Sequence, residues 1–200
     1  MDKKTQTINT YDNSAEALAK KFDERGARIL DIEETLSFIK TDNPHVFEIG
    51  CGNGRDALEI LKRTNNYLGI DISKNLIQLA KQKVPGADFM VADITEFEIP
   101  KNTDVVFAFA SLIHVRREEF KTILDSIFNA LNDGGLVRIS LKHNPVYKEL
   151  TEESEFGVRT YYLYSEQDIS ELSHKYIIIK SWIEEKGRGL WLEILLQKAS

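Results

Sequence analysis

The fold is decided by the stretch Val46-Phe47-Glu48-Ile49-Gly50-Cys51-Gly52-Asn53-Gly54-Arg55-Asp56-Ala57-Leu58. Its first four residues are mostly apolar and follow Pro44, which predicts a short buried strand. The three glycines that come next allow a sharp turn and let a ligand approach the backbone without a side chain in the way. From Ala57 onward, apolar residues recur at helical spacing, so a helix is expected after the turn. The free N–H groups at such a helix start can bind a polar or anionic ligand group, although the turn could also be purely structural.

The spacing of the glycines separates two classes of ligand. A dinucleotide-binding turn has the form G-x-G-x-x-G, and here Arg55 takes the place of its third glycine. This large charged side chain suits neither a diphosphate lying over the turn nor close packing of the helix on the strand. The form actually present, E-x-G-x-G-x-G from Glu48 onward, resembles motif one of the class I S-adenosylmethionine-dependent methyltransferases. That resemblance implies S-adenosylmethionine as the cofactor. The cofactor-binding residues that it implies within the turn are Gly50, Cys51, Gly52 and Gly54.

Composition and charge set broader limits. The 200 residues suit a single domain spanning 1–200, with the 42% hydrophobic and 29% charged residues of an ordinary globular protein. A net charge of −6 argues against a nucleic-acid partner, which would favour a basic face. The single cysteine excludes a disulfide framework and a four-cysteine zinc site, no His/Cys cluster predicts a metal, and the cytoplasm is the simplest location. The sequence shows neither a signal-peptide core nor an apolar run long enough for a bilayer, so no membrane is expected.

After the glycine turn, predicted strands alternate with amphipathic helices. Buried strands are expected at Tyr67–Ile70, Asp88–Val91, Thr103–Phe109 and Leu136–Leu141. Such an alternation indicates a parallel sheet that is covered on both faces. After a helix capped by Ser165, strands 177–183 and 190–196 are joined by a short polar loop, which indicates an antiparallel hairpin. The fold class is therefore α/β, a Rossmann-like doubly wound sheet, mostly parallel with an antiparallel C-terminal hairpin, and it resembles the seven-stranded methyltransferase fold.

Residues 1–42 are expected to form an N-terminal helical cover over the ligand. The first 12 residues are polar and are expected to be loose. A helix capped by Asn13 or Ser14 follows, and a second helix runs to about residue 39. The sequence Tyr11-Asp12-x-x-Ala15 resembles the start of many small-molecule methyltransferases, in which the aromatic ring helps to close over the cofactor. Tyr11 could equally be a half-buried anchor with no ligand role.

Three acidic residues, Glu48, Asp71 and Asp93, fall at the ends of predicted strands, where open α/β sheets bind ligands. Asp71 lies 21 residues (71 − 50) after the first glycine of the turn, near the spacing at which a carboxylate reaches ribose hydroxyls. The methyltransferase resemblance assigns Asp71 to the ribose, Asp93 to the adenine amino group and Glu48 to the methionine amino group. It also implies that Ile72 packs on the adenine and that the Ile94 N–H donates to the ring. Each acid could instead cap the helix that follows it.

The loop Ala110–Val115 follows the fourth predicted strand, where the family places groups between the cofactor and the methyl acceptor. By this resemblance Ala110 is a cofactor contact, and His114 is the candidate general base or substrate contact. His114 could also simply anchor the loop or start the next helix.

Residues 143–164 are expected to form a substrate-side insert that provides a wall of the acceptor pocket. Its Arg159, Tyr161 and Tyr162 could hold a planar or anionic small molecule. The same aromatic residues could instead hold a surface loop against the core. The stretch from Arg159 to residue 168, together with Trp191, resembles a group of small bacterial methyltransferases of unassigned substrate.

The leading hypothesis is methyl transfer from S-adenosylmethionine to a small-molecule acceptor by in-line displacement, carried out by a monomer or a homodimer. Because a sulfonium methyl group is already activated, the protein mainly has to position the reactants. The alternatives are a methyltransferase that acts on tRNA or a protein side chain, a cofactor-binding module without turnover, and a nicotinamide-dependent dehydrogenase. Arg55 and the C-terminal hairpin disfavour the dehydrogenase, and the lack of a basic accessory domain disfavours tRNA.

Overall fold

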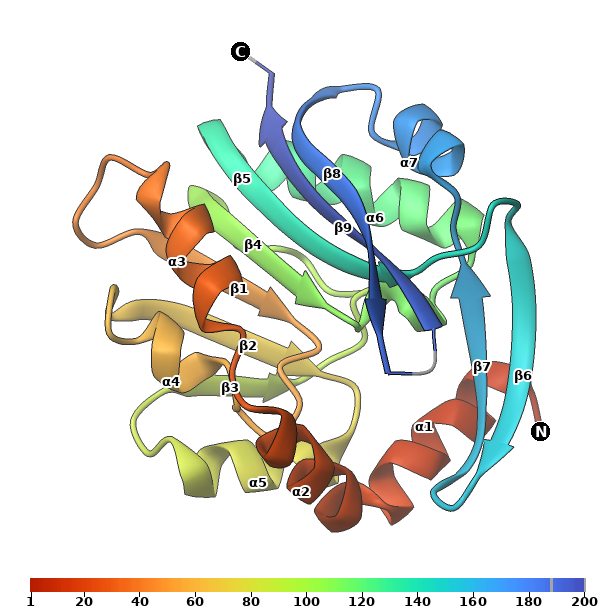
Figure 1. Cartoon of the computed structure of the whole chain (residues 1–200). Helices are drawn as coiled ribbons and strands as arrows, with labels where there is room; N and C mark the ends of the chain where they lie inside the picture. Colours follow the sequence, from red (N-terminus) through yellow and green to blue (C-terminus); the bar gives the residue numbers. More distant parts are fainter. Residues whose placement is uncertain (188, 200) are drawn as a thin grey trace.

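A seven-stranded sheet forms the centre of the computed structural model, which describes residues 1–187 and 189–199 (Figure 1). The strands are β1 (His45–Ile49), β2 (Asn66–Asp71), β3 (Asp88–Val91), β4 (Thr103–Phe109), β5 (Leu131–Lys142), β8 (Tyr176–Lys186) and β9 (Gly189–Lys198). Their order across the sheet is β3-β2-β1-β4-β5-β9-β8. Strands β1 to β5 are parallel, whereas β9 runs antiparallel to both β5 and β8. The predicted fold class is confirmed, and Arg188 of the predicted hairpin loop lies outside the described residues.

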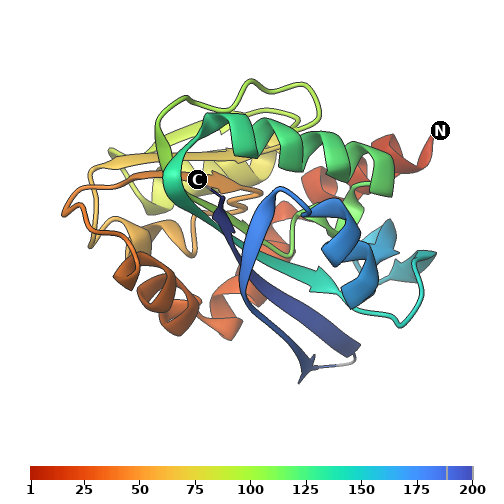
Figure 2. The same cartoon turned by 90° about the horizontal axis from the view of Figure 1, so that it is seen from above.

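Helices cover both faces of the sheet, with α3 and α6 on opposite sides (Figure 2). The helices are α1 (Lys3–Asn13), α2 (Ala15–Arg25), α3 (Ile29–Ser37), α4 (Ala57–Ile60), α5 (Lys74–Lys83), the 3-10 helix η1 (Leu112–His114), α6 (Arg117–Ala130) and α7 (Glu166–Leu172). Helices α6 and α7 pack on one face through buried residues such as Phe120 and Ile169. Helices α3 and α5 pack on the other face through Ile32 and Ile77. None of the described helices is long and apolar enough to cross a membrane.

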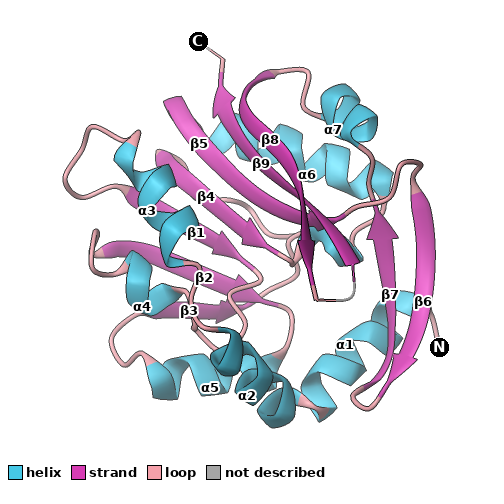
Figure 3. Ribbon diagram, viewed as in Figure 1, coloured by secondary structure: helices cyan, strands magenta, loops and turns pink. Residues whose placement is uncertain are grey.

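Residues 143–164 contain a second, two-stranded sheet, in which β6 (Lys148–Ser154) pairs antiparallel with β7 (Gly157–Leu163) (Figure 3). The sequence does not predict these strands, because the side chains of β6 are nearly all exposed and polar, so no buried face shows in its pattern. A bridge between His143 and Tyr164 connects this small sheet to the end of β5. The segment expected to form the substrate-side insert is therefore a hairpin beside α1.

The N-terminal residues form the regular helix α1, so the expectation of a loose segment over residues 1–12 is wrong. Asp2 caps the helix by accepting a hydrogen bond from the Thr5 backbone N–H at 3.0 Å. Further along, the Thr10 hydroxyl donates to the Val158 carbonyl oxygen of β7 at 2.7 Å. Contacts with a distant strand stabilise a helix that has no strong apolar stripe of its own, and the local sequence does not reveal such contacts.

The boundary between α6 and β5 also differs from the expectation. The sequence predicts a helix that carries Leu131 and ends at Gly134-Gly135. In the structure, α6 ends one residue before Leu131, which already pairs with Thr103 of β4. A register shift at Val105 accommodates the two glycines within β5. Strand pairing therefore overrides the helical periodicity at this point.

Gly50 allows the turn after β1 to approach the loop after β4. Its φ angle is +72°, in the left-handed region, and an added Cβ atom would lie 2.2 Å from the Cβ atom of Ser111. The N–H groups of Gly50 and Cys51 both donate to the Ile70 carbonyl oxygen, at 2.7 and 2.9 Å. The turn is therefore fixed between β2 and the β4 loop, and only glycine fits at position 50.

Replacing Gly50 with Ala should lower the free energy of unfolding more than replacing Gly26 with Ala. Both glycines have a φ angle near +74°, but an added Cβ atom at Gly26 meets nothing within 4 Å. We expect a loss of about 1–2 kcal/mol at Gly26 from backbone strain alone, and a further loss of about 1–3 kcal/mol at Gly50 from overpacking. Urea unfolding of the two variants measures the difference. Equal losses of unfolding free energy would show that Ser111 moves aside at no cost.

Candidate functional site

The carboxyl ends of β1 to β4 point toward α1 and form one edge of the sheet (Figure 3). Glu48 lies one residue before the end of β1, Asp71 ends β2, and Asp93 follows β3 by two residues. The register places Glu48 beside Gly69 of β2, so neighbouring strands end at a similar level. The three acidic residues singled out in the sequence therefore lie along the same edge of the sheet.

Asp71 connects the glycine turn to the end of β2. Its Oδ2 atom accepts a hydrogen bond from the Gly52 N–H at 2.9 Å, and its Oδ1 atom accepts one from the Ser73 N–H, also at 2.9 Å. Burial raises the pKa of Asp71 to about 6, against the effect of these two N–H groups. Each oxygen keeps a second lone pair, so the carboxylate can still accept hydrogen bonds from a ligand.

Glu48 is buried and accepts a hydrogen bond from the Tyr67 hydroxyl at 2.5 Å. Burial, with the negative charge of Asp56 adding to it, raises the pKa of Glu48 to about 8. Cys51 is also buried, and burial raises the pKa of its thiol above the usual value. A protonated thiol is a poor nucleophile, which agrees with the interpretation of Cys51 as a compact residue within the turn.

Asp93 is bound by the N-terminal helix. Its Oδ2 atom forms an ion pair with the Lys4 ammonium at 2.6 Å, and its Oδ1 atom accepts from the backbone N–H and the hydroxyl of Thr95. Burial alone would raise the pKa of Asp93, but the contacts with Lys4 and Thr95 lower it by more. The pKa of Asp93 therefore lies below its usual value. Lys4 thus occupies the carboxylate that the family resemblance assigns to the adenine amino group. Ile72 and Ile94, the predicted adenine contacts, are both half-buried.

The other end of α1 is bound to the start of α5. The Asp12 carboxylate accepts from the Ser73 hydroxyl at 2.7 Å and from the Asn75 N–H at 3.2 Å, and the Asp12 carbonyl oxygen accepts from the Asn75 side-chain amide at 2.9 Å. Together with the Lys4–Asp93 ion pair, these contacts place α1 across the edge of the sheet where the three acids lie.

His114 lies between α1 and β7. Its Nδ1 atom is 2.6 Å from the Thr160 carbonyl oxygen, so Nδ1 carries the proton and donates to that carbonyl. Its Nε2 atom, 2.8 Å from the Tyr11 hydroxyl oxygen, then accepts the hydroxyl proton of Tyr11. Burial lowers the pKa of His114 to about 4, and the charges of Arg159 and Lys142 act in the same direction. The imidazole is therefore neutral near pH 7, with both of its nitrogen atoms engaged.

Two of the three predicted substrate residues lie beside His114. The Tyr161 ring centre is 4.9 Å from that of His114, and the Arg159 guanidinium carbon is 5.6 Å from the ring centres of both Tyr11 and Tyr161. Tyr162 points to the opposite face of β7, because successive side chains of a strand alternate. There its hydroxyl accepts from the Arg116 Nε atom at 3.2 Å. The structure thus brings Arg159 and Tyr161, but not Tyr162, to His114.

The loop after β4 contributes a polar group that sequence reasoning did not single out. Ala110 has a φ angle of +55°, and its N–H donates to the Ser140 carbonyl oxygen at 3.1 Å. The next residue, Ser111, packs against Gly50, and its buried hydroxyl has no hydrogen-bond partner among the described residues. Because buried polar atoms are normally hydrogen-bonded, the Ser111 hydroxyl is free to form a hydrogen bond with a ligand atom.

Comparison with known proteins shows what this chain resembles. A family model described as a methyltransferase domain matches residues 46–135. The trans-aconitate 2-methyltransferase of Rhodopseudomonas palustris (strain BisB18) is 31% identical over 143 residues, which cover 66% of this chain and 51% of that protein. The carboxy-S-adenosyl-L-methionine synthase of Helicobacter hepaticus is 28% identical over 145 residues, covering 68% of this chain and 60% of that protein. The chain spans about half the length of the trans-aconitate methyltransferases that it matches.

Solved structures show the same fold. The magnesium protoporphyrin IX methyltransferase of Synechocystis PCC 6803, crystallised with bound S-adenosylmethionine, aligns with a TM-score of 0.75 and 15% identity, covering 100% of this chain and 98% of that one. The 1,6-didemethyltoxoflavin-N1-methyltransferase of Burkholderia thailandensis aligns with a TM-score of 0.75 and 16% identity, covering 96% of this chain and 88% of that one. The chain therefore has the fold of the class I S-adenosylmethionine-dependent methyltransferases and resembles a methyltransferase domain over residues 46–135.

The residues at the carboxyl edge fit the cofactor that class I methyltransferases use. S-adenosylmethionine carries an amino group, two ribose hydroxyls and an adenine amino group, all of which donate hydrogen bonds. Glu48, Asp71 and Asp93 offer carboxylate acceptors along this edge, beside a turn with three glycines. One feature opposes the fit, because Lys4 pairs with Asp93 and has to yield if adenine is to use that carboxylate.

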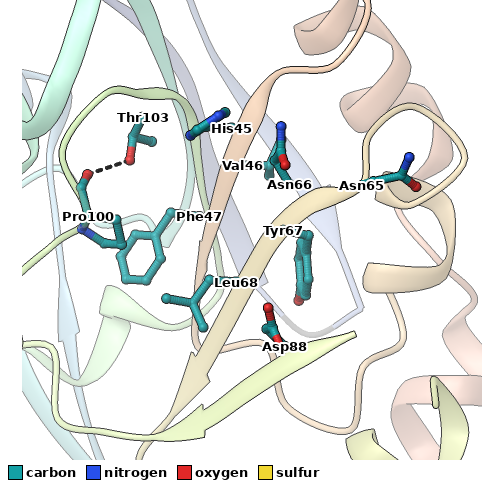
Figure 4. Close-up of a pocket in the computed structure, with 10 residues that line it drawn as sticks. All are labelled: His45, Val46, Phe47, Asn65, Asn66, Tyr67, Leu68, Asp88, Pro100 and Thr103. Carbon is teal, nitrogen blue, oxygen red and sulfur yellow. Dashed lines mark hydrogen bonds between the residues drawn. The ribbon is translucent and has the colours of Figure 1, made fainter. Parts of the chain in front are cut away.

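A separate hollow of about 240 Å³ lies at the amino ends of the strands, on the opposite side of the sheet from the candidate site (Figure 4). It is lined by the first residues of four strands, namely His45, Asn66, Asp88 and Thr103. Open α/β sheets bind ligands beyond the carboxyl ends of their strands, so this hollow is not the cofactor site.

Replacing Asp71 with Ala should weaken the binding of S-adenosylhomocysteine by about 1.5–3 kcal/mol, the range for hydrogen bonds to a charged group. The substitution removes an acceptor for the ribose and releases the N–H groups of Gly52 and Ser73. Asp88→Ala is the matched control, because Asp88 is exposed at the start of β3, at the other edge of the sheet. Isothermal titration calorimetry measures both variants, and an unchanged dissociation constant for Asp71→Ala would show that the end of β2 does not contact the cofactor.

Proposed function

We propose that this chain transfers a methyl group from S-adenosylmethionine to a small-molecule acceptor. The observation that carries the proposal is the convergence of the glycine turn with Glu48, Asp71 and Asp93 at one edge of the sheet, covered by α1. The bound cofactor supplies an activated sulfonium methyl group. The protein has to hold the acceptor in line with it and to exclude water. The cytoplasm and a monomer or homodimer remain the proposed setting.

Each cofactor contact follows from the position of a side chain. Asp71, held by the glycine turn, would accept from the ribose hydroxyls, with Ile72 against the adenine. Asp93 would accept from the adenine amino group once Lys4 yields, and the Ile94 N–H would donate to the ring. Buried Glu48 would bind the amino group of the methionine part.

The acceptor side is formed by the N-terminal cover and the insert. Helix α1 and strand β7 are joined by hydrogen bonds from the Thr10 hydroxyl to the Val158 carbonyl oxygen and from the Thr160 N–H to the Thr7 hydroxyl oxygen. We propose that residues 1–42 cover the cofactor and that residues 143–164 wall the acceptor. A site covered by α1 and bordered by β7 favours a small molecule over a tRNA or a protein side chain. The names of two similar proteins, trans-aconitate 2-methyltransferase and 1,6-didemethyltoxoflavin-N1-methyltransferase, likewise describe small-molecule acceptors.

Calorimetry with S-adenosylmethionine, S-adenosylhomocysteine and NAD tests the cofactor assignment directly. Saturable binding of the first two, with none of NAD, supports the proposal, whereas binding of NAD alone would overturn it. Mass spectrometry of compounds that co-purify with the protein, followed by assays with tritiated S-adenosylmethionine, then identifies the acceptor. Cofactor binding without turnover on any acceptor would favour a binding module.

Cofactor binding should release a proton from Glu48. At pH 7 the carboxyl group is mostly protonated, because its pKa is raised to about 8. The cationic amino group of the cofactor stabilises the ionised form, so binding lowers this pKa and affinity rises with pH between about 6 and 8. Calorimetry at pH 7 in buffers with different heats of ionisation should show close to one proton released. The Glu48→Gln variant, which cannot ionise, should lose this component, and the same release from that variant would assign the proton to another group.

Replacing His114 with Ala should lower kcat and leave the dissociation constant of S-adenosylhomocysteine nearly unchanged. We infer that His114 acts through Tyr11, because the Tyr11 hydroxyl donates to its Nε2 atom. Tyr11→Phe, which keeps the ring, should then lower kcat to a similar extent, and the double variant should be no worse than either single variant. His174→Ala is the control, because His174 is exposed after α7. Wild-type kcat in His114→Ala would leave His114 with only the anchoring role.

A further inference from the structure

Arg159 is a half-buried cation that forms no ion pair with a carboxylate within the described ranges 1–187 and 189–199. Its Nε atom is buried without a hydrogen-bond partner, and one terminal nitrogen reaches only the Ser154 hydroxyl, at 3.4 Å. Glu152, which faces Arg159 across the β6–β7 ladder, approaches Lys142 instead, at 3.8 Å. A guanidinium that is partly removed from water and not neutralised is well placed to bind an anion.

A second cation borders the same aromatic ring. The Lys142 Nζ atom at the end of β5 lies 4.2 Å from the ring centre of Tyr161, and the Arg159 guanidinium carbon lies 5.6 Å from it. The ion pair of Lys142 with Glu152 is weak, because the Glu152 side chain is 48% exposed and the two charged atoms are 3.8 Å apart. The group formed by Arg159, Lys142 and Glu152 therefore keeps a net positive charge.

These cations lie on the side of the site where the methyl acceptor has to be. Arg159 is 5.6 Å from the ring centre of Tyr11, whose hydroxyl contacts His114 in the loop after β4. Burial raises the pKa of Tyr11, and the positive charge of Arg159 only partly offsets this effect. Tyr11 therefore stays protonated near neutral pH and separates the cations from the acidic cofactor edge.

His114, the candidate base of this region, has no nitrogen free to accept a proton. His114 donates through Nδ1 to the Thr160 carbonyl oxygen and accepts through Nε2 from the Tyr11 hydroxyl. A hydroxyl acceptor has to lose a proton during methyl transfer, and neither nitrogen is free to take it. A carboxylate, with an ordinary pKa of about 4, has already lost its proton at neutral pH.

We propose that the methyl acceptor is a small carboxylic acid, bound as its anion by Arg159 and Lys142 and methylated on a carboxylate oxygen. This inference rests on the proposed methyltransferase function and specifies its substrate class. A lone pair of the carboxylate oxygen forms the new bond to the methyl carbon, and the carbon–sulfur bond breaks with its electron pair remaining on sulfur. The products are a methyl ester and the neutral thioether, and no proton has to be removed.

Tritiated S-adenosylmethionine tests the substrate class with fumarate, citrate, benzoate and octanoate as probes, each paired with its neutral amide. Methyl esters release volatile methanol in alkali, whereas methyl ethers and methylamines do not. We expect label transfer to at least one acid, none to the amides, and complete release of that label as methanol. Transfer to no acid by protein that binds S-adenosylhomocysteine, or an alkali-stable product, would overturn the inference.

Arg159→Met should raise KM for the accepted acid, and its dissociation constant in the presence of S-adenosylhomocysteine, at least tenfold. Arg159→Lys should recover part of the loss, and Lys142→Met should show a similar defect. The matched control is Arg116→Met, because Arg116 contacts Tyr162 on the opposite face of β7. Circular dichroism checks the folding of each variant.

The dissociation constant of S-adenosylhomocysteine alone should be the same in all of these variants. This control separates the two hypotheses, because loss of cofactor binding in the wild type would reject the proposed function itself. Unchanged acid affinity in both Arg159→Met and Lys142→Met would reject only the carboxylate site.

Discussion

The hydrogen bond from the Gly52 N–H to the Asp71 carboxylate, at 2.9 Å, is the contact on which the candidate site depends. It fastens the glycine turn after β1 to the end of β2, and the same carboxylate accepts the Ser73 N–H at the start of α5. Two backbone N–H groups on one anion fix the relative positions of a turn, a strand and a helix. Because Gly50 lets the turn lie against Ser111, the loop after β4 is positioned by the same arrangement.

Charge is divided across the site. The proposed cofactor side carries Glu48, Asp71 and Asp93, whereas the proposed acceptor side carries Lys142 and Arg159. Between them stand Tyr11 and His114, hydrogen-bonded to each other, and burial keeps both side chains uncharged near neutral pH. Apart from the Lys4–Asp93 pair, no ion pair joins these acids to these cations among the described residues.

The parts of the fold that could be predicted from the sequence are those with a local signal. Strand β4 is an apolar run and the turn at Gly50 is a spacing of glycines, so both follow from short stretches of sequence. The hairpin of β6 and β7 has no such signal, since the side chains of β6 face water. Helix α1 is polar along most of its length and gains its order from contacts such as that between Thr10 and Val158.

The same distinction applies to the candidate site. Glu48, Asp71 and Asp93 could be singled out because each lies at or near the end of an apolar strand, at a recognisable distance from the glycines. The partners of these residues could not be identified in the same way. Lys4 reaches Asp93 across 89 residues (93 − 4), and the Thr160 carbonyl that orients His114 is a backbone atom with no signature in the sequence. Lys142 could not be singled out either, because only the folding of the insert brings Tyr161 beside it.

Lys4 and Tyr11 stand on the same helix, seven residues (11 − 4) or about two turns apart. Lys4 contacts Asp93, the proposed partner of adenine, and Tyr11 contacts His114 on the proposed acceptor side. Because α1 is one continuous helix, a movement of Lys4 away from Asp93 would also change the position of Tyr11 relative to His114. Helix α1 thereby links the two sides of the candidate site, and such a link acts equally in both directions.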